Sequence, residues 1–277
     1  MLKQRILTAL VLLALLLPAL AVRSVWPFAI LTLVVMAAAG WEWVRLNDGA
    51  ALAVPLGIGL GIACGLALWA GWGEAAPRLA WWLATAVWVL GGAWVLRGGV
   101  AGWPRLPRAL RWGIGLVALW TAWLALANAK ASGLNFILSI FCLVWSADIC
   151  AYAGGRAFGK RKLAPGISPG KSWEGVWSGM IGALLVAAAW LAVDKSGWVD
   201  SVSLYGVIAA RFGFAGLALV VVFLVAMSVV GDLFESLVKR SAGAKDSSGL
   251  LPGHGGVLDR VDALLPVFPI ALAMVSL

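Results

Sequence analysis

The sequence predicts an all-α fold, a polytopic bundle of about nine helices embedded in a membrane. Hydrophobic residues make up 63% of the 277 residues and charged residues only 12%, whereas a soluble domain carries roughly 25% charged residues. The hydrophobic residues form long runs, many of the roughly 17–25 residues that span a bilayer. Many of the 18 tryptophans lie near the ends of these runs, where amphipathic rings meet the membrane interface. These observations exclude an ordinary soluble protein.

Nine apolar segments follow one another, and each is expected to be a helix because a helix satisfies its own backbone hydrogen bonds in lipid. They cover residues 6–22, 24–41, 50–72, 79–96, 112–129, 133–155, 176–193, 212–231 and 263–277. The first has features of a signal peptide, with Lys3 and Arg5 before it and Ala19-Leu20-Ala21 near its end. Its apolar run is long for a signal peptide, so we expect a retained helix. The scarcity of polar linkers predicts a single membrane-embedded domain over residues 1–277.

The positive charges predict that the N-terminus is cytoplasmic. If the segments alternate from there, sixteen Lys and Arg side chains face the cytoplasm, in agreement with the positive-inside rule. The five on the outer side are Arg23, Arg78, Lys130, Lys195 and Arg211. The net charge of +9 is therefore mainly cytoplasmic. It suits contact with anionic lipid, a highly anionic substrate, or both.

Two cytoplasmic segments, residues 148–175 and 231–262, hold seven of the twelve acidic residues. Acidic side chains against a membrane are costly and usually functional. The outer loops hold only Glu74, Asp194 and Asp200, which we interpret as solvated charges. The chemistry is therefore expected in the two cytoplasmic segments, which we take as the active-site segments.

The first active-site segment combines glycines with cations, a composition that suits a backbone approaching phosphate groups closely. Its polar candidates are Asp148, Arg156, Lys160, Ser168, Lys171, Ser172 and Glu174. A plain basic loop is the alternative for this stretch taken alone. The run Gly166 to Ser172 superficially matches a phosphate-binding P-loop, but three residues instead of four separate its glycines. No strand is predicted before it, so we exclude a P-loop NTPase.

The second active-site segment begins with a helix that has one polar face, because its polar residues are spaced three or four apart. These residues are Asp232, Glu235, Ser236 and Lys239. The Pro-Gly-His-Gly-Gly turn that follows permits a chain reversal, which would return Asp259 and Asp262 to this face. Carboxylates beside cations suit Mg²⁺ bound together with a nucleoside triphosphate. An amphipathic surface helix followed by a flexible loop would explain the helix but not the density of acids.

The turn also contains His254, the only histidine of the chain. A single histidine between glycines favours a role in orienting the backbone or contacting phosphate over a role as a general base.

The second segment closely resembles the signature of the phosphatidate cytidylyltransferases, also called CDP-diacylglycerol synthases. The resemblance covers 27 consecutive residues and rests on Ser236-Leu-Val-Lys239-Arg240, Lys245-Asp246 and Leu251-Pro-Gly-His254-Gly255-Gly256-Val-Leu-Asp259-Arg260-Val-Asp262. The stretches ending at Asp148 and running from Ser168 to Gly175 look like the other cytoplasmic block of this family. Gly170 stands where a lysine is common, and Ser172 where a threonine is common. The amino-terminal half resembles the family mainly in hydropathy.

The resemblance implies an enzyme that transfers the cytidylyl group of CTP to phosphatidate, giving CDP-diacylglycerol and pyrophosphate. It implies a bacterial inner-membrane protein, a homodimer with no nucleic-acid partner, that depends on Mg²⁺ and leaves a second cation open. Asp232 and Asp259 are the implied metal ligands, supported by Asp246 and Asp262. The expected catalytic residues are Asp232, Lys239, Arg240, Lys245, Asp246, Asp259 and Arg260. The expected substrate-binding residues are Asp148, Arg156, Lys160, Ser168, Lys171, Ser172, Glu174, His254, Gly255 and Gly256.

Four other functions fit the sequence less well. An ion-coupled transporter would place charges near the middle of several spans, and these are almost uncharged here. A CDP-alcohol phosphotransferase would carry an Asp-x-x-Asp-Gly-x-x-Ala-Arg core, which this chain lacks. A non-enzymatic scaffold would leave the acids and glycines unexplained. A CTP-dependent lipid kinase shares the charge and topology, and its release of CDP instead of pyrophosphate would distinguish it.

Overall fold

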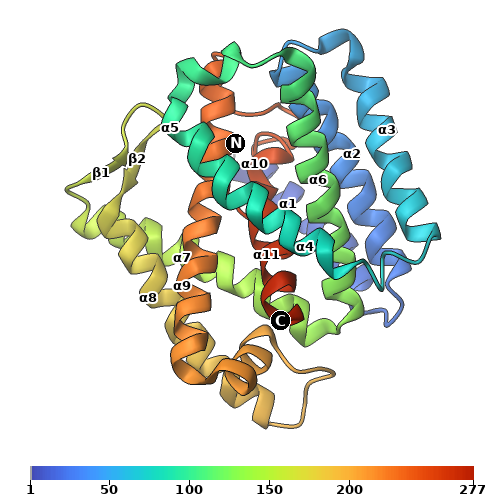
Figure 1. The fold of residues 1–277 in the computed structure, drawn as a ribbon, viewed down its shortest axis with the longest axis vertical. Helices are drawn as coiled ribbons and strands as arrows, with labels where there is room; N and C mark the ends of the chain where they lie inside the picture. The colour runs from blue at the N-terminus through green and yellow to red at the C-terminus, as the bar shows by residue number, and fades with distance from the viewer. Residues whose placement is uncertain (1) are drawn as a thin grey trace.

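A computed structural model describes residues 2–277 and confirms the predicted all-α class, with one small hairpin added (Figure 1). In the first helix, it describes the side chains of residues 6–8 and from 10 onwards. The helices are α1 (Leu2–Ala21), α2 (Trp26–Leu46), α3 (Ala50–Trp69), α4 (Arg78–Ala86), the π-helix η1 (Val87–Gly91), α5 (Gly92–Gly102), the 3₁₀-helix η2 (Trp103–Arg105), α6 (Arg108–Ala131), α7 (Leu134–Phe158), α8 (Trp173–Lys195), α9 (Leu204–Ser241), α10 (Leu258–Val261) and α11 (Leu264–Ser276). Strands β1 (Lys162–Ala164) and β2 (Ser168–Ser172) pair antiparallel, with Lys162 opposite Ser172.

Within residues 2–277, seven helices are long and apolar enough to cross a membrane. They are α2, α3, the continuous stretch from α4 to η2, α6, α7, α8 and α9. The apolar part of α1, residues 6–21, and the 13 residues of α11 are shorter. The multi-span architecture is therefore confirmed, whereas the predicted count of nine is not.

The helix α9 is much longer than the segment 212–231 that hydropathy predicts. It has 38 residues, or about 57 Å at 1.5 Å per residue. A kink lies at Gly213, whose φ of 69° falls in the left-handed region that glycine adopts readily. Beyond the predicted end, the same helix continues through the polar face that starts at Asp232. The site is therefore built directly on the end of a span.

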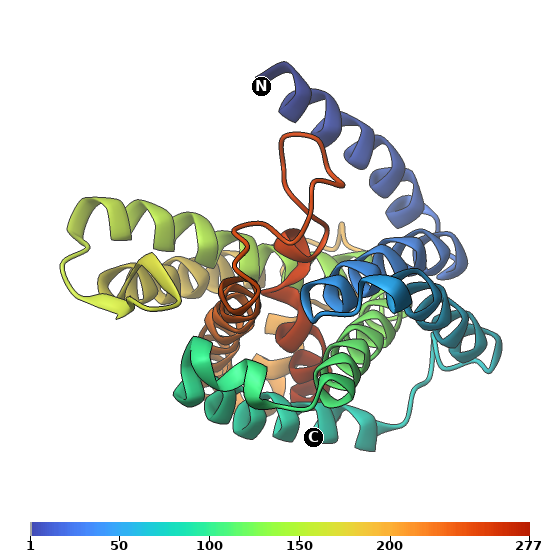
Figure 2. The ribbon, with the colours of Figure 1, turned by 90° about the horizontal axis from the view of Figure 1, so that it is seen from above.

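The last helix, α11, forms the centre of the bundle instead of a peripheral span. It packs against α9, α6 and α4, and Figure 2 shows it surrounded by the other helices. Val267, Phe268, Ile270 and Ala271 are fully buried. Thirteen residues make a helix of only about 20 Å, short of the roughly 30 Å of a hydrocarbon core. Because α11 is enclosed by protein, its length does not need to match the bilayer.

The helices α7 and α8 pack unusually closely because glycines face the neighbouring backbone. A Cβ atom on Gly175 would lie 2.8 Å from the carbonyl oxygen of Ala151, and one on Gly179 would lie 2.8 Å from that of Ala147. Small residues allow helix backbones to approach each other in membranes. This close contact sets the width of the pocket described below.

Candidate active site

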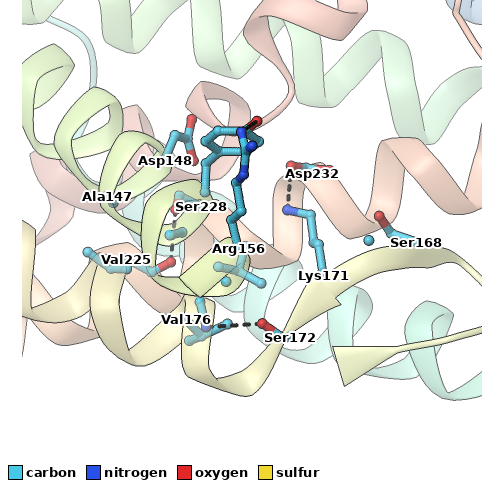
Figure 3. A pocket seen from close by; sticks show the side chains of 17 residues that line it. Ala147, Asp148, Arg156, Ser168, Lys171, Ser172, Val176, Val225, Ser228 and Asp232 are labelled. Atoms are coloured by element: carbon cyan, nitrogen blue, oxygen red, sulfur yellow. Dashed lines mark hydrogen bonds and ion pairs between the residues drawn. The ribbon is translucent and has the colours of Figure 1, made fainter. Parts of the chain in front are cut away.

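A pocket of about 460 Å³ lies between α7, α8, α9 and the hairpin (Figure 3). Its residues come from four elements: α7, β2 and α8, which follow one another within residues 147–179, and α9, which contributes residues 225–232. The lining residues are Ala147, Asp148, Ala151, Tyr152, Gly155, Arg156, Ser168, Gly170, Lys171, Ser172, Gly175, Val176, Gly179, Val225, Ser228, Val229 and Asp232. Six of the predicted site residues are therefore brought together here: Asp148, Arg156, Ser168, Lys171, Ser172 and Asp232.

One end of the pocket is charged, and we define it by Asp148 and Arg156 of α7, Lys171 of β2 and Asp232 of α9. The Lys171 ammonium forms an ion pair with the Asp232 carboxylate, and Figure 3 shows the two side chains facing each other across the pocket. Both side chains are about 30% exposed, at 27% and 31%, so ligands can reach them. The Arg156 guanidinium lies 3.5 Å from the Tyr152 hydroxyl.

The rest of the pocket lining is mainly apolar and belongs to the membrane-spanning helices. Val176 and Gly179 contribute to it from α8, and Val225 and Val229 contribute to it from α9. On α9 the two valines precede Asp232, and on α8 the two residues follow Ser172. The apolar lining therefore belongs to helices that can span the membrane. The pocket can thus accept a ligand with an anionic head and apolar tails.

The hairpin and the loop before it are ordered by two side chains that the sequence marks as substrate-binding. Ser172 is the N-cap of α8 and accepts a hydrogen bond of 3.2 Å from the Gly175 backbone N–H. Glu174 accepts hydrogen bonds of 3.1 Å from the backbone N–H groups of Lys160 and Arg161 and forms an ion pair with Arg161. Glu174 thus shapes the loop, and Lys160 and Glu174 do not line the pocket.

A second charged cluster lies one to two turns further along α9. The Lys239 Nζ atom lies 2.5 Å from Glu235 Oε2 and 2.5 Å from Asp259 Oδ1. All three side chains are largely buried, and that of Glu235 is only 2% exposed. The pair between Lys239 and Asp259 confirms the prediction that the glycine turn returns Asp259 to the polar face of α9.

The two aspartates that follow the turn have opposite pKa shifts. Burial alone would raise the pKa of Asp259, but hydrogen bonds from Lys239, Gly256 and Ser247 outweigh it, and the pKa lies below its usual value. Burial raises the pKa of Asp262 to about 8, and the nearby charge of Asp232 adds to this rise. The Asp262 carboxyl therefore connects the two clusters electrostatically.

The remaining predicted residues lie in the exposed loop between α9 and α10 or at its edges. Arg240 donates to the Ala244 carbonyl oxygen at 3.2 Å, and Arg260 donates to that of His254. Lys245 and Asp246 are exposed and form no ion pair within the described chain. None of these four side chains forms an ion pair with either cluster in the described chain. Their predicted catalytic roles stay predictions.

The glycines of the turn contribute through their backbone conformation and backbone hydrogen bonds. Gly255 has a φ of 86°, and its carbonyl oxygen accepts a hydrogen bond of 2.8 Å from the Leu251 N–H. The Gly256 N–H donates to Asp259 Oδ2 at 2.8 Å. The His254 Nδ1 atom is buried and has no hydrogen-bond partner among residues 2–277.

The family model described as the cytidylyltransferase family matches residues 3–277, nearly the whole chain. The chain belongs to the cytidylyltransferase family. It is 42% identical to the phosphatidate cytidylyltransferase of Pseudomonas aeruginosa over 289 residues, which cover 99% of this chain and 97% of that protein. It is 50% identical to the Haemophilus influenzae phosphatidate cytidylyltransferase over 137 residues, covering 50% of this chain and 44% of that one. The corresponding protein of Bacillus subtilis is 37% identical over 150 residues, covering 54% and 51%. The resemblance found in the sequence is thus confirmed.

The predicted metal ligands of this cytidylyltransferase family member are not gathered into one group. No cluster of three or more His, Cys, Asp or Glu side chains in the described part of the chain is arranged to hold a metal ion. Asp232 and Asp259 each pair with a different lysine, and Asp246 is exposed. The donor chemistry nevertheless fits Mg²⁺, which is commonly held by one or two carboxylates together with substrate phosphates.

Sequence reasoning missed Glu42, which belongs to the same region. The predicted second span ends at residue 41, whereas α2 continues to Leu46 and carries Glu42 fully buried. Its carboxylate accepts hydrogen bonds from the loop that precedes α10. An acidic residue at membrane depth is itself a signal of function, and this signal was available in the sequence.

Proposed function

We propose that this protein transfers the cytidylyl group of CTP to phosphatidate, giving CDP-diacylglycerol and pyrophosphate, as a step of membrane phospholipid synthesis. The observation that carries the proposal is the two-part pocket between α7, α8 and α9. Phosphatidate has the same two parts, a strongly anionic head and apolar tails. Membership of the cytidylyltransferase family and the names of the relatives support the same reaction.

The chemistry needs positioning and charge neutralisation more than proton transfer. A phosphate monoester has a second pKa near ~6, so the phosphatidate head is largely dianionic at neutral pH and needs no general base. One of its oxygens attacks the α-phosphorus of CTP, a new P–O bond forms, and the bond to the β-phosphate breaks. Pyrophosphate leaves with the electron pair of that bond. Two polyanions must therefore meet, and cations must stabilise the charge of the leaving group.

The lysines of the two clusters are suited to this task. Lys171 and Lys239 each lie against an aspartate, and each can exchange that partner for a phosphate oxygen. Arg156 adds a third cation at the charged end of the pocket. We assign the phosphatidate head to this end, with its tails along Val176, Val225 and Val229. Arg240, Lys245 and Arg260 are proposed to approach the triphosphate from the exposed loop.

We further propose that Asp232 and Asp259 hold Mg²⁺ together with the phosphates, with Asp246 and Asp262 in support and a second cation left open. When bound, the ion would neutralise charge on the triphosphate.

We place the protein in the bacterial inner membrane with this site facing the cytoplasm, and we expect a homodimer. The proposal for the membrane is supported by the seven apolar helices of the described chain and by the bacterial relatives. The orientation rests on the distribution of positive charge.

The test is a transfer assay with protein purified in detergent, phosphatidate, Mg²⁺ and CTP labelled at the α-phosphate. We expect label to enter the lipid with one pyrophosphate released per labelled lipid, and EDTA to stop both. Release of labelled CDP with unlabelled lipid, from a folded preparation, would replace this function by a lipid kinase. If neither labelled lipid nor labelled CDP forms, both functions are contradicted.

A further inference from the structure

The fully buried carboxylate of Glu42 joins the second helix to the loop that carries the catalytic aspartate. The Val257 N–H donates to Glu42 Oε1 at 2.9 Å, and the Leu258 N–H donates to Oε2 at 2.8 Å. The Ser247 hydroxyl lies 3.1 Å from Oε2, and the Ser248 hydroxyl donates to Oε1. Both oxygens are therefore occupied by donors more than 200 residues away in sequence.

No lysine or arginine pairs with Glu42 in the described part of the chain. A buried carboxylate without a counter-charge is costly unless hydrogen bonds satisfy it. Here the Val257 and Leu258 N–H groups and the Ser248 hydroxyl do so. An apolar side chain at this position would leave the Val257 and Leu258 N–H groups without their acceptor, which is costly for buried donors. The Glu42 carboxylate therefore holds the loop in its conformation by accepting these hydrogen bonds.

Ser247 links the loop to Asp259, because it contacts both Glu42 and the Asp259 carboxylate. Asp259 Oδ2 accepts from the Ser247 N–H at 3.0 Å, the Ser247 hydroxyl at 2.9 Å and the Gly256 N–H at 2.8 Å. The other oxygen, Oδ1, lies against Lys239 at 2.5 Å. One oxygen of Asp259 is thus fixed by the loop, and the loop determines where the other one points.

Gly256 explains why the turn cannot carry a larger residue here. A Cβ atom at this position would lie 2.5 Å from Glu42 Oε1 and closer still to the Ser247 hydroxyl. The glycine therefore makes room for the contact between the loop and α2, a reason for this residue type that requires no substrate.

We propose that Glu42 is a positioning residue: it clamps the loop from Ser247 to Leu258 onto α2 so that Asp259 presents its Oδ1 atom toward Lys239. The proposal rests on the proposed function in that Asp259 takes part in the reaction. It adds a residue from the amino-terminal half of the chain, where no site residue is predicted from the sequence.

The test compares Glu42→Gln and Ser248→Ala with Glu74→Gln, an exposed acid in the loop between α3 and α4. Glu42→Gln keeps the shape but places an NH₂ group against a backbone N–H. Ser248→Ala removes one donor to Glu42 without touching Asp259, and it remains informative if Glu42→Gln does not fold. The first readout is hydrogen–deuterium exchange of residues 247–258, which does not depend on activity. The second is the dependence of the reaction on Mg²⁺ and phosphatidate.

We expect faster exchange of this loop in Glu42→Gln and, to a smaller degree, in Ser248→Ala, with no change in Glu74→Gln. We expect kcat to fall about 10- to 100-fold in Glu42→Gln, as for partners that orient metal ligands, and the half-saturating Mg²⁺ concentration to rise. The KM for phosphatidate should stay unchanged. If the loop exchanges at the wild-type rate in both Glu42→Gln and Ser248→Ala, the proposal is overturned even if the wild-type protein is active. Altered exchange in a protein whose wild type transfers nothing would retain the clamp and reject the function. A loss of activity in step with the loss of folded protein, without a shift in Mg²⁺ dependence, would reduce Glu42 to a structural role and overturn the proposal.

Discussion

The aspartates Asp232 and Asp259 are each neutralised by one lysine, and this defines their expected behaviour on mutation. Asp232→Asn and Asp259→Asn remove a negative charge but keep the side-chain shape. We expect each to lower the transfer rate at least about 100-fold, the scale of losing a group that stabilises developing charge. The yield of folded protein should be preserved in both variants, and the melting temperature in Asp232→Asn. Asp259→Asn should also lower the melting temperature, because its buried carboxylate accepts hydrogen bonds from Lys239, Ser247 and Gly256. A purified Asp232→Asn or Asp259→Asn protein with near wild-type turnover would remove that residue from the catalytic set.

The two lysines differ in burial, so their replacement should separate activity from stability. The pair of Lys171 and Asp232 is about 30% exposed on each side, and such pairs contribute little to stability. Lys239 lies between Glu235 and Asp259, whose side chains are 2% and 8% exposed. Lys239→Gln leaves two buried carboxylates without a counter-charge, which costs about 3–5 kcal/mol.

We therefore expect Lys171→Gln to lose activity with little change in melting temperature, and Lys239→Gln to lose both. Thermal unfolding followed by tryptophan fluorescence in detergent checks this difference. Equal melting temperatures for the two variants would mean that the buried cluster does not depend on Lys239.

At the scale of elements, the close contact between α7 and α8 makes a measurable prediction. Gly179→Ala would place a methyl group 2.8 Å from the Ala147 carbonyl oxygen, so the helices must separate. We expect a loss of about 1–3 kcal/mol in stability and a lower transfer rate, because the pocket lies between these helices. Gly59→Ala in α3 is the matched control, since nothing lies within 4 Å of its added Cβ. The idea fails if Gly179→Ala is as stable as Gly59→Ala.

At the other end of the bundle, Asp200 ties the loop before α9 to the start of α7. It accepts hydrogen bonds from the backbone N–H groups of Leu134 at 2.6 Å and Asn135 at 2.9 Å. Burial alone would raise its pKa, but these bonds outweigh burial and lower the pKa below 3.8. A lowered pKa contributes stability above the unfolded-state value, and this contribution disappears as the pH falls through the folded-state value.

Asp200→Ala should therefore lower the melting temperature by an amount that is constant from pH 5 to 8 and shrinks below about pH 4. The expected loss at neutral pH is about 1 kcal/mol, the scale for removing a side chain that accepts hydrogen bonds from N–H groups at a helix N-terminus. Lys195→Ala, at an exposed position nearby, is the control. A difference that persists unchanged at pH 3 would show that charge on Asp200 is not involved.

At the scale of the whole molecule, sequence patterns correctly predicted the features that depend on residues close together in the chain. The helical spacing of Asp232, Glu235 and Lys239 predicted one polar face, and the glycine turn predicted the return of Asp259; the pair of Lys239 and Asp259 confirms both. Hydropathy predicted the spans but not their ends, because it stops at the first charge. It therefore ended the second span before Glu42 and predicted only the part of α9 between Arg211 and Asp232.

Contacts across the chain were beyond this reasoning. The bond of Glu42 to Ser247 joins residues 205 positions apart, and no local pattern reports such a pair. The hairpin was missed because strands of three and five residues are too short for a detectable alternation. The central position of α11 was missed because an apolar run looks the same whether it faces lipid or protein.

The orientation of the bundle is the remaining whole-molecule prediction, and two exposed positions at opposite ends test it. Ala242 follows α9 beside the active-site loop, and Trp198, 93% exposed, lies between α8 and α9. In a background with Cys64, Cys142 and Cys150 replaced by Ala, Ala242→Cys and Trp198→Cys each provide one thiol. An impermeant maleimide added to intact spheroplasts should label only Trp198→Cys, and Ala242→Cys should react once the membrane is opened. The reverse pattern would place the active site outside, away from cytoplasmic CTP, and would contradict both the orientation and the function that depends on it.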